Sequence, residues 1–307
     1  MISLRQHAIS LVAVFLALAV GVVLGSGFVA DTFGSSSDAQ DKREQELRDE
    51  NQQLTNNVNA ANNFDTAIAG RLLEGSLKDR PVLIITAPGA DEGDVAAVKD
   101  NLNKAGAVFN GQVALTDTFV SDQNAEKMRS IIDQSIPPGS TLKTELTDSG
   151  GRAGDLLGLL LNLSKDDAEP QVPASDTDAG LAALKQGGFI DYANGAVSPA
   201  QLSIIVTGNK FADDSGARGQ VIARFAGAFS ERGAGTVLVG RTGSAEGSSP
   251  IAVVRADPGL NSKVSTVDNV DQATGRITTV LALSDELGNK EGAYGTGPGA
   301  SAIAPES

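Results

Sequence analysis

The sequence predicts an α/β protein with a single N-terminal transmembrane helix, a coiled-coil helix and then a layered α/β domain with a largely parallel sheet. Residues 8–30 contain no charged side chain, and residues 38–76 place apolar side chains at steps of three and four residues. From residue 82 onward, β-branched runs alternate with amphipathic segments. We therefore expect an anchor at 1–30, a linker and coiled coil at 31–76, an α/β globular domain at 77–290 and a disordered tail at 291–307.

The first thirty residues predict a membrane anchor. About 20 apolar residues in a helix, at about 1.5 Å each, cross a hydrocarbon core of about 30 Å. A cleaved signal peptide is the alternative, because Gly25 and Gly27 supply the small residues of a cleavage site. Arg5 precedes the apolar run and Asp31 follows it, so we expect a single pass in the cell membrane, with a cytoplasmic N-terminus and an extracytoplasmic C-terminal domain.

A GxxxG motif lies within this segment, at Gly21 and Gly25. Small residues four positions apart let two helix backbones approach closely, so the motif predicts pairing of two anchors. The alternative is that glycine is simply frequent in membrane helices.

A heptad pattern follows a short flexible break expected at 34–37. The positions predicted to form the coiled-coil core are Leu47, Asn51, Leu54, Val58, Ala61, Ile68 and Leu72. Asn51 is the kind of polar core residue that fixes register and strand number, whereas Asp65 interrupts the pattern. An amphipathic helix packed on its own domain, or a coil with another protein, would fit the same residues. We favour a parallel homodimer, because the coil continues a helix that carries GxxxG.

The remaining chain predicts a layered domain. The strands are expected at 82–86, 108–115, 202–207, 236–239, 251–255 and 263–267, and the helices at 94–105, 121–136, 155–163, 180–186, 217–231 and 276–286. Strands that alternate with helices predict a largely parallel sheet with helices on its faces.

The charge of the exported part limits its partners. After residue 30 there are 23 basic and 38 acidic side chains, a net charge of −15. Nucleic acids and anionic lipids both require basic surfaces, so no nucleic-acid partner is expected. The sequence has no cysteine, which excludes disulfides and thiolate chemistry.

The loop after the first predicted strand carries acids where a nucleotide site would need room for phosphate. Asp91, Glu92 and Asp94 occupy the start of the next helix, and neither G-x-G-x-x-G nor a Walker lysine follows. We interpret these acids as capping and helix-dipole residues. Asp268 and Asp271 are likewise interpreted as turn and cap residues.

Residues for catalysis or metal binding are scarce. His7 is the single histidine and lies at the membrane edge, so no Ser-His-Asp or Cys-His site can be built. Ser140 and Lys143 match S-x-x-K spacing, but no K-T-G or S-D-N motif accompanies them. Copper sites use Cys, Met and His, and outside the anchor this chain offers only Met128. We therefore predict no catalytic, cofactor-binding or metal site, and a protein that is not an enzyme.

The opening run MISLRQHAISLVAVFLALAVGVVLGSG, the coil, VLIITAPGAD and VSTVDNVDQATGRITTVLAL resemble the actinobacterial MctB/SteB family over nearly the whole chain. The resemblance implies one of two functions. One is copper efflux in the envelope, as for the mycobacterial members. The other is control of septal peptidoglycan hydrolysis during cell separation, with a SteA-like membrane partner, as for the corynebacterial members.

One predicted spanning helix cannot enclose a pore, since unpaired backbone cannot face lipid. We therefore expect a non-enzymatic, membrane-anchored envelope scaffold or regulator, a homodimer that acts with a SteA-like partner in cell separation. An envelope protein bound by the coil or the α/β head is a further expected partner. The alternative is an envelope protein of copper efflux and homeostasis. A degenerate enzyme-like domain that binds a small ligand is a third possibility.

Overall fold

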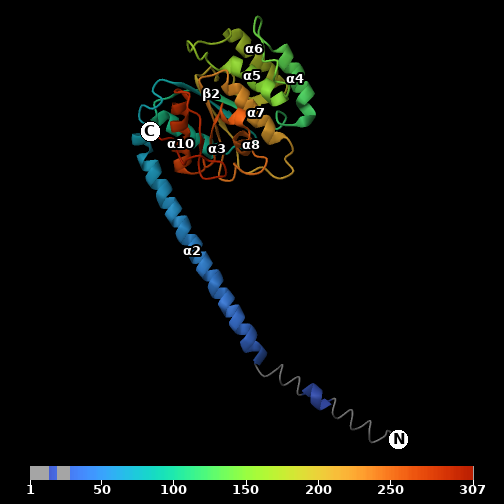
Figure 1. Cartoon of the computed structure of the whole chain (residues 1–307), viewed down its shortest axis with the longest axis vertical. Helices are drawn as coiled ribbons and strands as arrows, with labels where there is room; N and C mark the ends of the chain where they lie inside the picture. Colours follow the sequence, from blue (N-terminus) through green and yellow to red (C-terminus); the bar gives the residue numbers. More distant parts are fainter. Residues whose placement is uncertain (1–13, 19–27, 307) are drawn as a thin grey trace, which may run out of the picture. The chain divides into compact units, whose positions relative to one another are not determined.

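The computed structural model describes residues 14–18 and 28–306. The chain divides into two compact units, Met1–Ala61 and Asn62–Ser307 (Figure 1). Within the described residues, no helix is both long and apolar enough to cross a membrane. The predicted anchor, with Gly21 and Gly25, lies largely outside the described residues.

Helix α2 runs from Phe28 to Leu73 without a break. The flexible break predicted at 34–37 is wrong, because those residues are helical. One glycine costs a helix only about 1 kcal/mol, and the segment that follows is rich in strong helix formers. Polar side chains inside the helix bond to its own carbonyls: Asn51 Nδ2 donates to Leu47 O at 2.8 Å, and Thr55 Oγ1 donates to Asn51 O at 2.8 Å.

A seven-stranded sheet forms the centre of the second unit, in the order β3-β2-β1-β4-β5-β6-β7. Its strands are β1 (Pro81–Thr86), β2 (Val108–Leu115), β3 (Ile190–Asp191), β4 (Leu202–Val206), β5 (Gly235–Val239), β6 (Ser265–Val267) and β7 (Ala293–Tyr294). All neighbours are parallel except β2 and β3. The predicted α/β fold with a largely parallel sheet is confirmed. Strands β1, β4 and β5 are buried apart from the first residue of β1, as expected of their continuous β-branched runs.

Helices cover both faces of this sheet (Figure 1). One core lies beneath α4 (Ala125–Gln134), α5 (Ser149–Leu161), α6 (Ala174–Gln186), α7 (Arg218–Ser230) and α8 (Pro250–Ala256). The other lies beneath α3 (Glu92–Lys104), α10 (Ala273–Glu286) and the end of α2. Two short helices, η1 (Asp122–Asn124) and α9 (Pro258–Asn261), complete the connections. Ala69 and Leu73 of α2 are 1% and 0% exposed, so the core of this unit includes residues before 77.

Helices α5 and α7 pack against each other with backbones in near contact. A Cβ atom on Gly150 would lie 2.3 Å from Val221 O, and one on Gly154 would lie 2.3 Å from Phe225 O. The apolar helix predicted at 155–163 is therefore buried in its own domain, and it begins earlier, after Asp148 caps it by accepting from Gly151 N at 2.8 Å.

The strand predicted at 251–255 is wrong, because these residues form α8. Pro250 occupies the first turn, where its missing N–H costs nothing. Ile251 and Val254, three positions apart, are both fully buried, which is helical spacing. The apolar run is therefore compatible with a strand or a helix, and Pro250 at the first position favours the helix.

The prediction of a disordered tail from residue 291 is also wrong. Ala293 and Tyr294 form β7 and are 6% and 8% exposed. The buried Asp268 carboxylate holds the segment beyond them, accepting from Thr296 N at 2.8 Å and Gly297 N at 2.9 Å. Its glycine- and proline-rich composition predicts disorder, but these hydrogen bonds order it.

Candidate functional site

The sheet order reverses at β1, because the chain next adds β2 on one side and later adds β4 on the other. In sheets of this kind, ligands bind where the loops diverge at the carboxyl ends of such strands. A cavity of about 600 Å³ lies at this point. Its walls come from the loops after β1, β2 and β4 and from the start of α7.

Two glycines keep the loops after β1 and β4 in contact beneath the cavity. A Cβ atom on Gly208 would lie 2.2 Å from Gly89 O, and Gly89 itself has φ +88°. The strands below are in register, with Ala87 N donating to Val206 O at 2.8 Å. A larger residue at position 208 would therefore push apart the two loops that form the floor.

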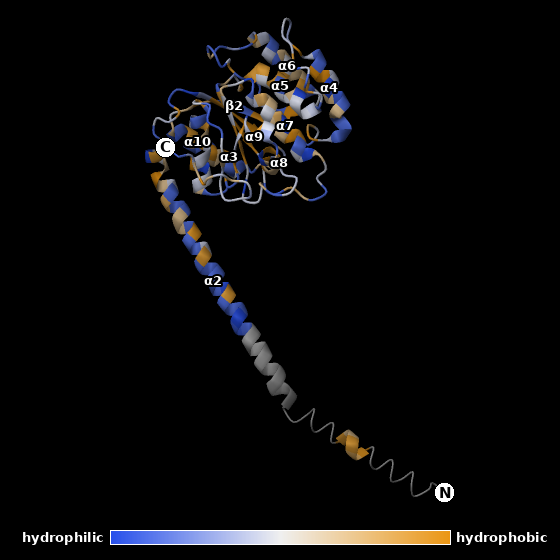
Figure 2. Cartoon of the chain, in the orientation of Figure 1, coloured by the Kyte–Doolittle hydropathy of each residue, from blue (hydrophilic) through white to orange (hydrophobic). Residues whose placement is uncertain are grey.

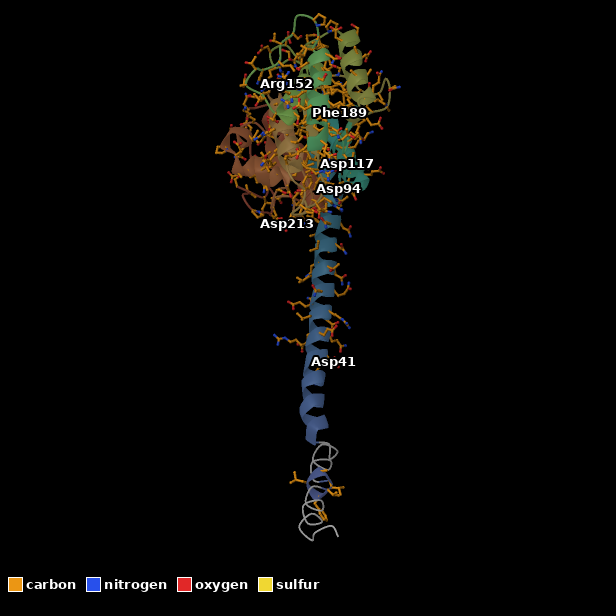
Figure 3. The ribbon with its side chains drawn as sticks, turned by 90° about the vertical axis from the view of Figure 1, so that its right-hand side faces the viewer. Asp41, Asp94, Asp117, Arg152, Phe189 and Asp213 are labelled. Atoms are coloured by element: carbon orange, nitrogen blue, oxygen red, sulfur yellow. The ribbon has the colours of Figure 1, made fainter. Side chains whose placement is uncertain are left out.

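Charged side chains of both signs line the cavity, together with an apolar patch. Arg218, at the start of α7, forms an ion pair with Asp117, from the loop after β2 (labelled in Figure 3). Lys210 Nζ lies 3.1 Å from Glu246 Oε2. The apolar lining consists of Val120, Phe211 and Ile222, with Ala212 and Pro88 beside it.

The acidic loop after β1 behaves as predicted. Asp91 caps α3 by accepting from Gly93 N at 2.8 Å and from Asp94 N at 3.1 Å. Asp94 is 5% exposed, and burial raises the pKa of its carboxyl, although Arg241, whose Nε lies 3.0 Å from its Oδ2, opposes that shift. The carboxylates therefore occupy the helix N-terminus that a phosphate would need.

The two aspartates interpreted as turn or cap residues differ. Asp271 lies in a turn and accepts from Thr242 N at 2.8 Å, as expected. Asp268 instead is 1% exposed and pairs with Arg255, whose Nη1 lies 2.6 Å from its Oδ2. Nothing in the local sequence links Arg255 to Asp268, because Arg255 lies on α8 and Asp268 follows β6.

The coiled-coil positions lie along α2. Four of them are more than half exposed, with exposed fractions of 52% (Leu47), 55% (Leu54), 52% (Val58) and 52% (Leu72). Apolar bands recur along this otherwise polar helix (Figure 2), and its side chains project around it (Figure 3). Asn51 and Ala61 are exposed and Ile68 is partly buried.

The face of α2 that packs on the α/β unit is a different one. Ala69 and Leu73 are buried there, and Asn62 Oδ1 accepts from Ala273 N at 2.9 Å, which caps α10 from a neighbouring helix. At 100° per residue, this face lies about a quarter-turn from the stripe formed by the coiled-coil positions. The exposed side chains of Leu47, Leu54 and Val58 in this stripe are therefore available for contact with another chain.

The family model described as "Copper transport outer membrane protein, MctB" matches residues 1–305 of the chain. The chain belongs to the MctB family. The Copper transporter MctB of Mycobacterium tuberculosis (strain ATCC 25618 / H37Rv) is 45% identical over 310 residues, which is 99% of both chains. The protein of the same name from Mycobacterium leprae (strain TN) is 45% identical over 323 residues, again 99% of both.

The MctB name refers to copper, so the donor set of this member matters. The whole sequence contains no cysteine, two methionines and one histidine. Met128 is 1% exposed inside the core, and His7 lies outside the described residues. Among residues 14–18 and 28–306, no three His, Cys, Asp or Glu side chains are grouped so that they could hold a metal ion. The described part of this MctB-family chain does not fit a resident copper centre.

Proposed function

We propose that this chain is an envelope protein of copper homeostasis, with copper as the cargo of the system in which it acts. The observation that carries the proposal is family membership: the MctB model matches residues 1–305, and relatives 45% identical over 99% of both chains are named copper transporters. The description of the family as an outer membrane protein supports a location in the envelope.

The proposal includes the membrane anchor predicted from the sequence. Residues 8–30 carry no charge and suffice in length to cross a bilayer as a helix. Arg5 before the run and Asp31 after it support a cytoplasmic N-terminus and an extracytoplasmic α/β domain. Gly21 and Gly25 would form the contact between two anchors.

The molecule would act as a non-enzymatic scaffold, with α2 as its dimerisation element. The exposed stripe through Leu47, Leu54 and Val58 would pair two copies as a parallel coiled coil, with Asn51 setting the register. The donor set supports a scaffold over a copper carrier, because copper prefers Cys, Met and His ligands. A protein partner would then supply the copper path.

A deletion strain tests the copper role. If the proposal holds, the strain accumulates copper and grows poorly on it, and the intact gene restores growth. Two variants then test the scaffold: Leu54→Asp in the stripe and, as a matched control, Gln53→Asp beside it. Leu54→Asp is expected to abolish crosslinked dimers and copper resistance, whereas Gln53→Asp preserves both. Normal copper resistance in the deletion strain would refute the proposed function.

Cell separation is a second candidate function, with a SteA-like membrane partner and control of septal peptidoglycan hydrolysis. The scarcity of copper donors and the long exposed stripe of α2 favour it, since both suit a protein that binds proteins. Chained cells with unresolved septa in the deletion strain, together with normal growth on copper, would support this function over the first. Pull-down of the crosslinked intact protein from membranes would identify the partner.

A further inference from the structure

Side chains of opposite charge line the cavity at the carboxyl edge of the sheet. Arg218 comes from α7 and Asp117 from the loop after β2, and both line the cavity. Lys210 and Asp214, from the loop after β4, add one charge of each sign. Taken together, these four lining side chains carry no net charge, whereas the chain as a whole carries −14.

We propose that this cavity binds a small zwitterion, a short peptide that carries one carboxylate and one ammonium group. The ligand would insert into the Arg218–Asp117 pair. Its carboxylate would bind the guanidinium of Arg218, and its ammonium would bind the carboxylate of Asp117. This site is independent of the copper role and of the coiled coil.

Charge balance selects the class of ligand. A simple anion that binds Arg218 leaves Asp117 without its cation, and a simple cation that binds Asp117 leaves Arg218 without its anion. A zwitterion replaces both partners at once, so that Arg218 and Asp117 each keep a hydrogen-bonded counter-charge. The planar guanidinium of Arg218 also matches a carboxylate in a two-bond geometry.

Opening the existing ion pair costs little. The side chains of Arg218 and Asp117 are 43% and 81% exposed, and exposed pairs contribute little to stability. The guanidinium of Arg218 and the carboxylate of Asp117 can separate by rotation about side-chain bonds to admit a ligand. By contrast, the buried pair of Arg255 and Asp268 is 4% and 1% exposed and belongs to the core.

The size and lining of the cavity suit this ligand. Its volume of about 600 Å³ lies within the usual range for small-molecule sites. Val120, Phe211 and Ile222 provide an apolar wall for a short side chain next to the charged groups. The loop that carries Phe211 is held in place, since Phe211 N donates to Ser249 Oγ at 2.9 Å.

Calorimetric titration of the full chain in detergent tests the proposal with three matched probes. Alanyl-alanine carries both charges, N-acetyl-alanyl-alanine lacks the ammonium, and alanyl-alanine amide lacks the carboxylate. We expect alanyl-alanine to bind, and each blocked form to bind about tenfold more weakly or worse, the effect of one lost charged contact. No binding of alanyl-alanine at millimolar concentration, or equal binding of a blocked form, would overturn the proposal.

Variants then assign the two contacts. Arg218→Gln should abolish binding, and Asp117→Asn should bind alanyl-alanine and its acetylated form equally. Arg224→Gln is the matched control, because Arg224 lies on the same helix and pairs with Asp148, 3.7 Å away, outside the cavity. It should bind as the wild type does, and circular dichroism verifies that each variant is folded. Unchanged binding in folded Arg218→Gln or Asp117→Asn, or an equal loss in Arg224→Gln, would contradict the assignment.

Discussion

Arg255 joins the C-terminal segment to the sheet, and its replacement by Met should weaken the attachment of that segment. The guanidinium donates to Asp268 Oδ2 at 2.6 Å, to Tyr294 O at 2.7 Å, to Pro298 O at 2.9 Å and to Thr266 Oγ1 at 3.0 Å. Methionine fills much of the volume of the side-chain stem but makes none of these bonds. The substitution therefore isolates the polar contacts from the packing.

The expected cost follows from burial. Breaking a buried ion pair typically costs about 3–5 kcal/mol, because the remaining charge is left without a partner. Asp268 is 1% exposed but keeps hydrogen bonds from Thr296 N and Gly297 N, so we expect the lower end, about 3 kcal/mol. That is a large share of the roughly 5–15 kcal/mol that stabilises a typical domain.

Urea unfolding followed by circular dichroism measures the loss, and hydrogen exchange locates it. Amides of residues 293–302 should exchange much faster in Arg255→Met, whereas those of β1 and β4 remain the slowest. Arg224→Met is the control, because the side chain of Arg224 is 51% exposed. A loss below about 1 kcal/mol, with unchanged exchange at 293–302, would refute the importance of this buried pair.

Three further predictions concern other buried contacts. Burial raises the pKa of Glu286 to about 7 from 4.5. Between these two pH values the folded state therefore binds more protons than the unfolded state. The free energy of unfolding should fall by about 3 kcal/mol as the pH rises from 4.5 to 7. Glu286→Gln should flatten this dependence in urea titrations at several pH values, and an unchanged slope would contradict it. Asn62→Ala should lower the free energy of unfolding by about 1 kcal/mol, because it removes the cap from α10. Amides at the start of that helix should then exchange faster. Exchange no faster than in the wild type would argue against the cap. Gly154→Ala should lower the free energy of unfolding by about 1–3 kcal/mol or more, because the added Cβ would lie 2.3 Å from Phe225 O. Gly70→Ala should leave stability unchanged or raise it, because the added Cβ would have no atom within 4 Å. Equal unfolding midpoints for these two glycine variants would refute close packing of α5 on α7.

Local patterns predicted most of the fold, because the central elements have unambiguous sequences. Residues 82–86 and 202–207 are continuous β-branched runs that suit only a strand buried on both faces, and both are strands of the sheet. Residues 251–255 were ambiguous, since a short apolar run fits a strand or a helix equally well. Pro250, in the first helical turn, was the local signal that could have resolved the ambiguity.

The candidate site was less predictable. The sequence indicated the loop after β1 and identified Asp91 as a cap, which the structure confirms. It gave no indication of Arg218 and Asp117, because they are 101 residues apart and neither belongs to a motif. The glycine at 295 was no usable signal for the ordered tail, because only the structure shows that a Cβ atom there would lie 2.3 Å from Asp268 Oδ1.

The sequence by itself determined the α/β class, the long helix with its apolar stripe, the acidic character of the chain after residue 30 and the scarcity of copper donors. These properties depend on composition and on periodicity within single segments. Tertiary structure alone decided which strands meet at β1, which charged side chains line the cavity together, and that Arg255 and Asp268 hold the tail. Each of these depends on the pairing of distant segments, and that pairing is set by the burial of the whole sheet rather than by any local run of residues.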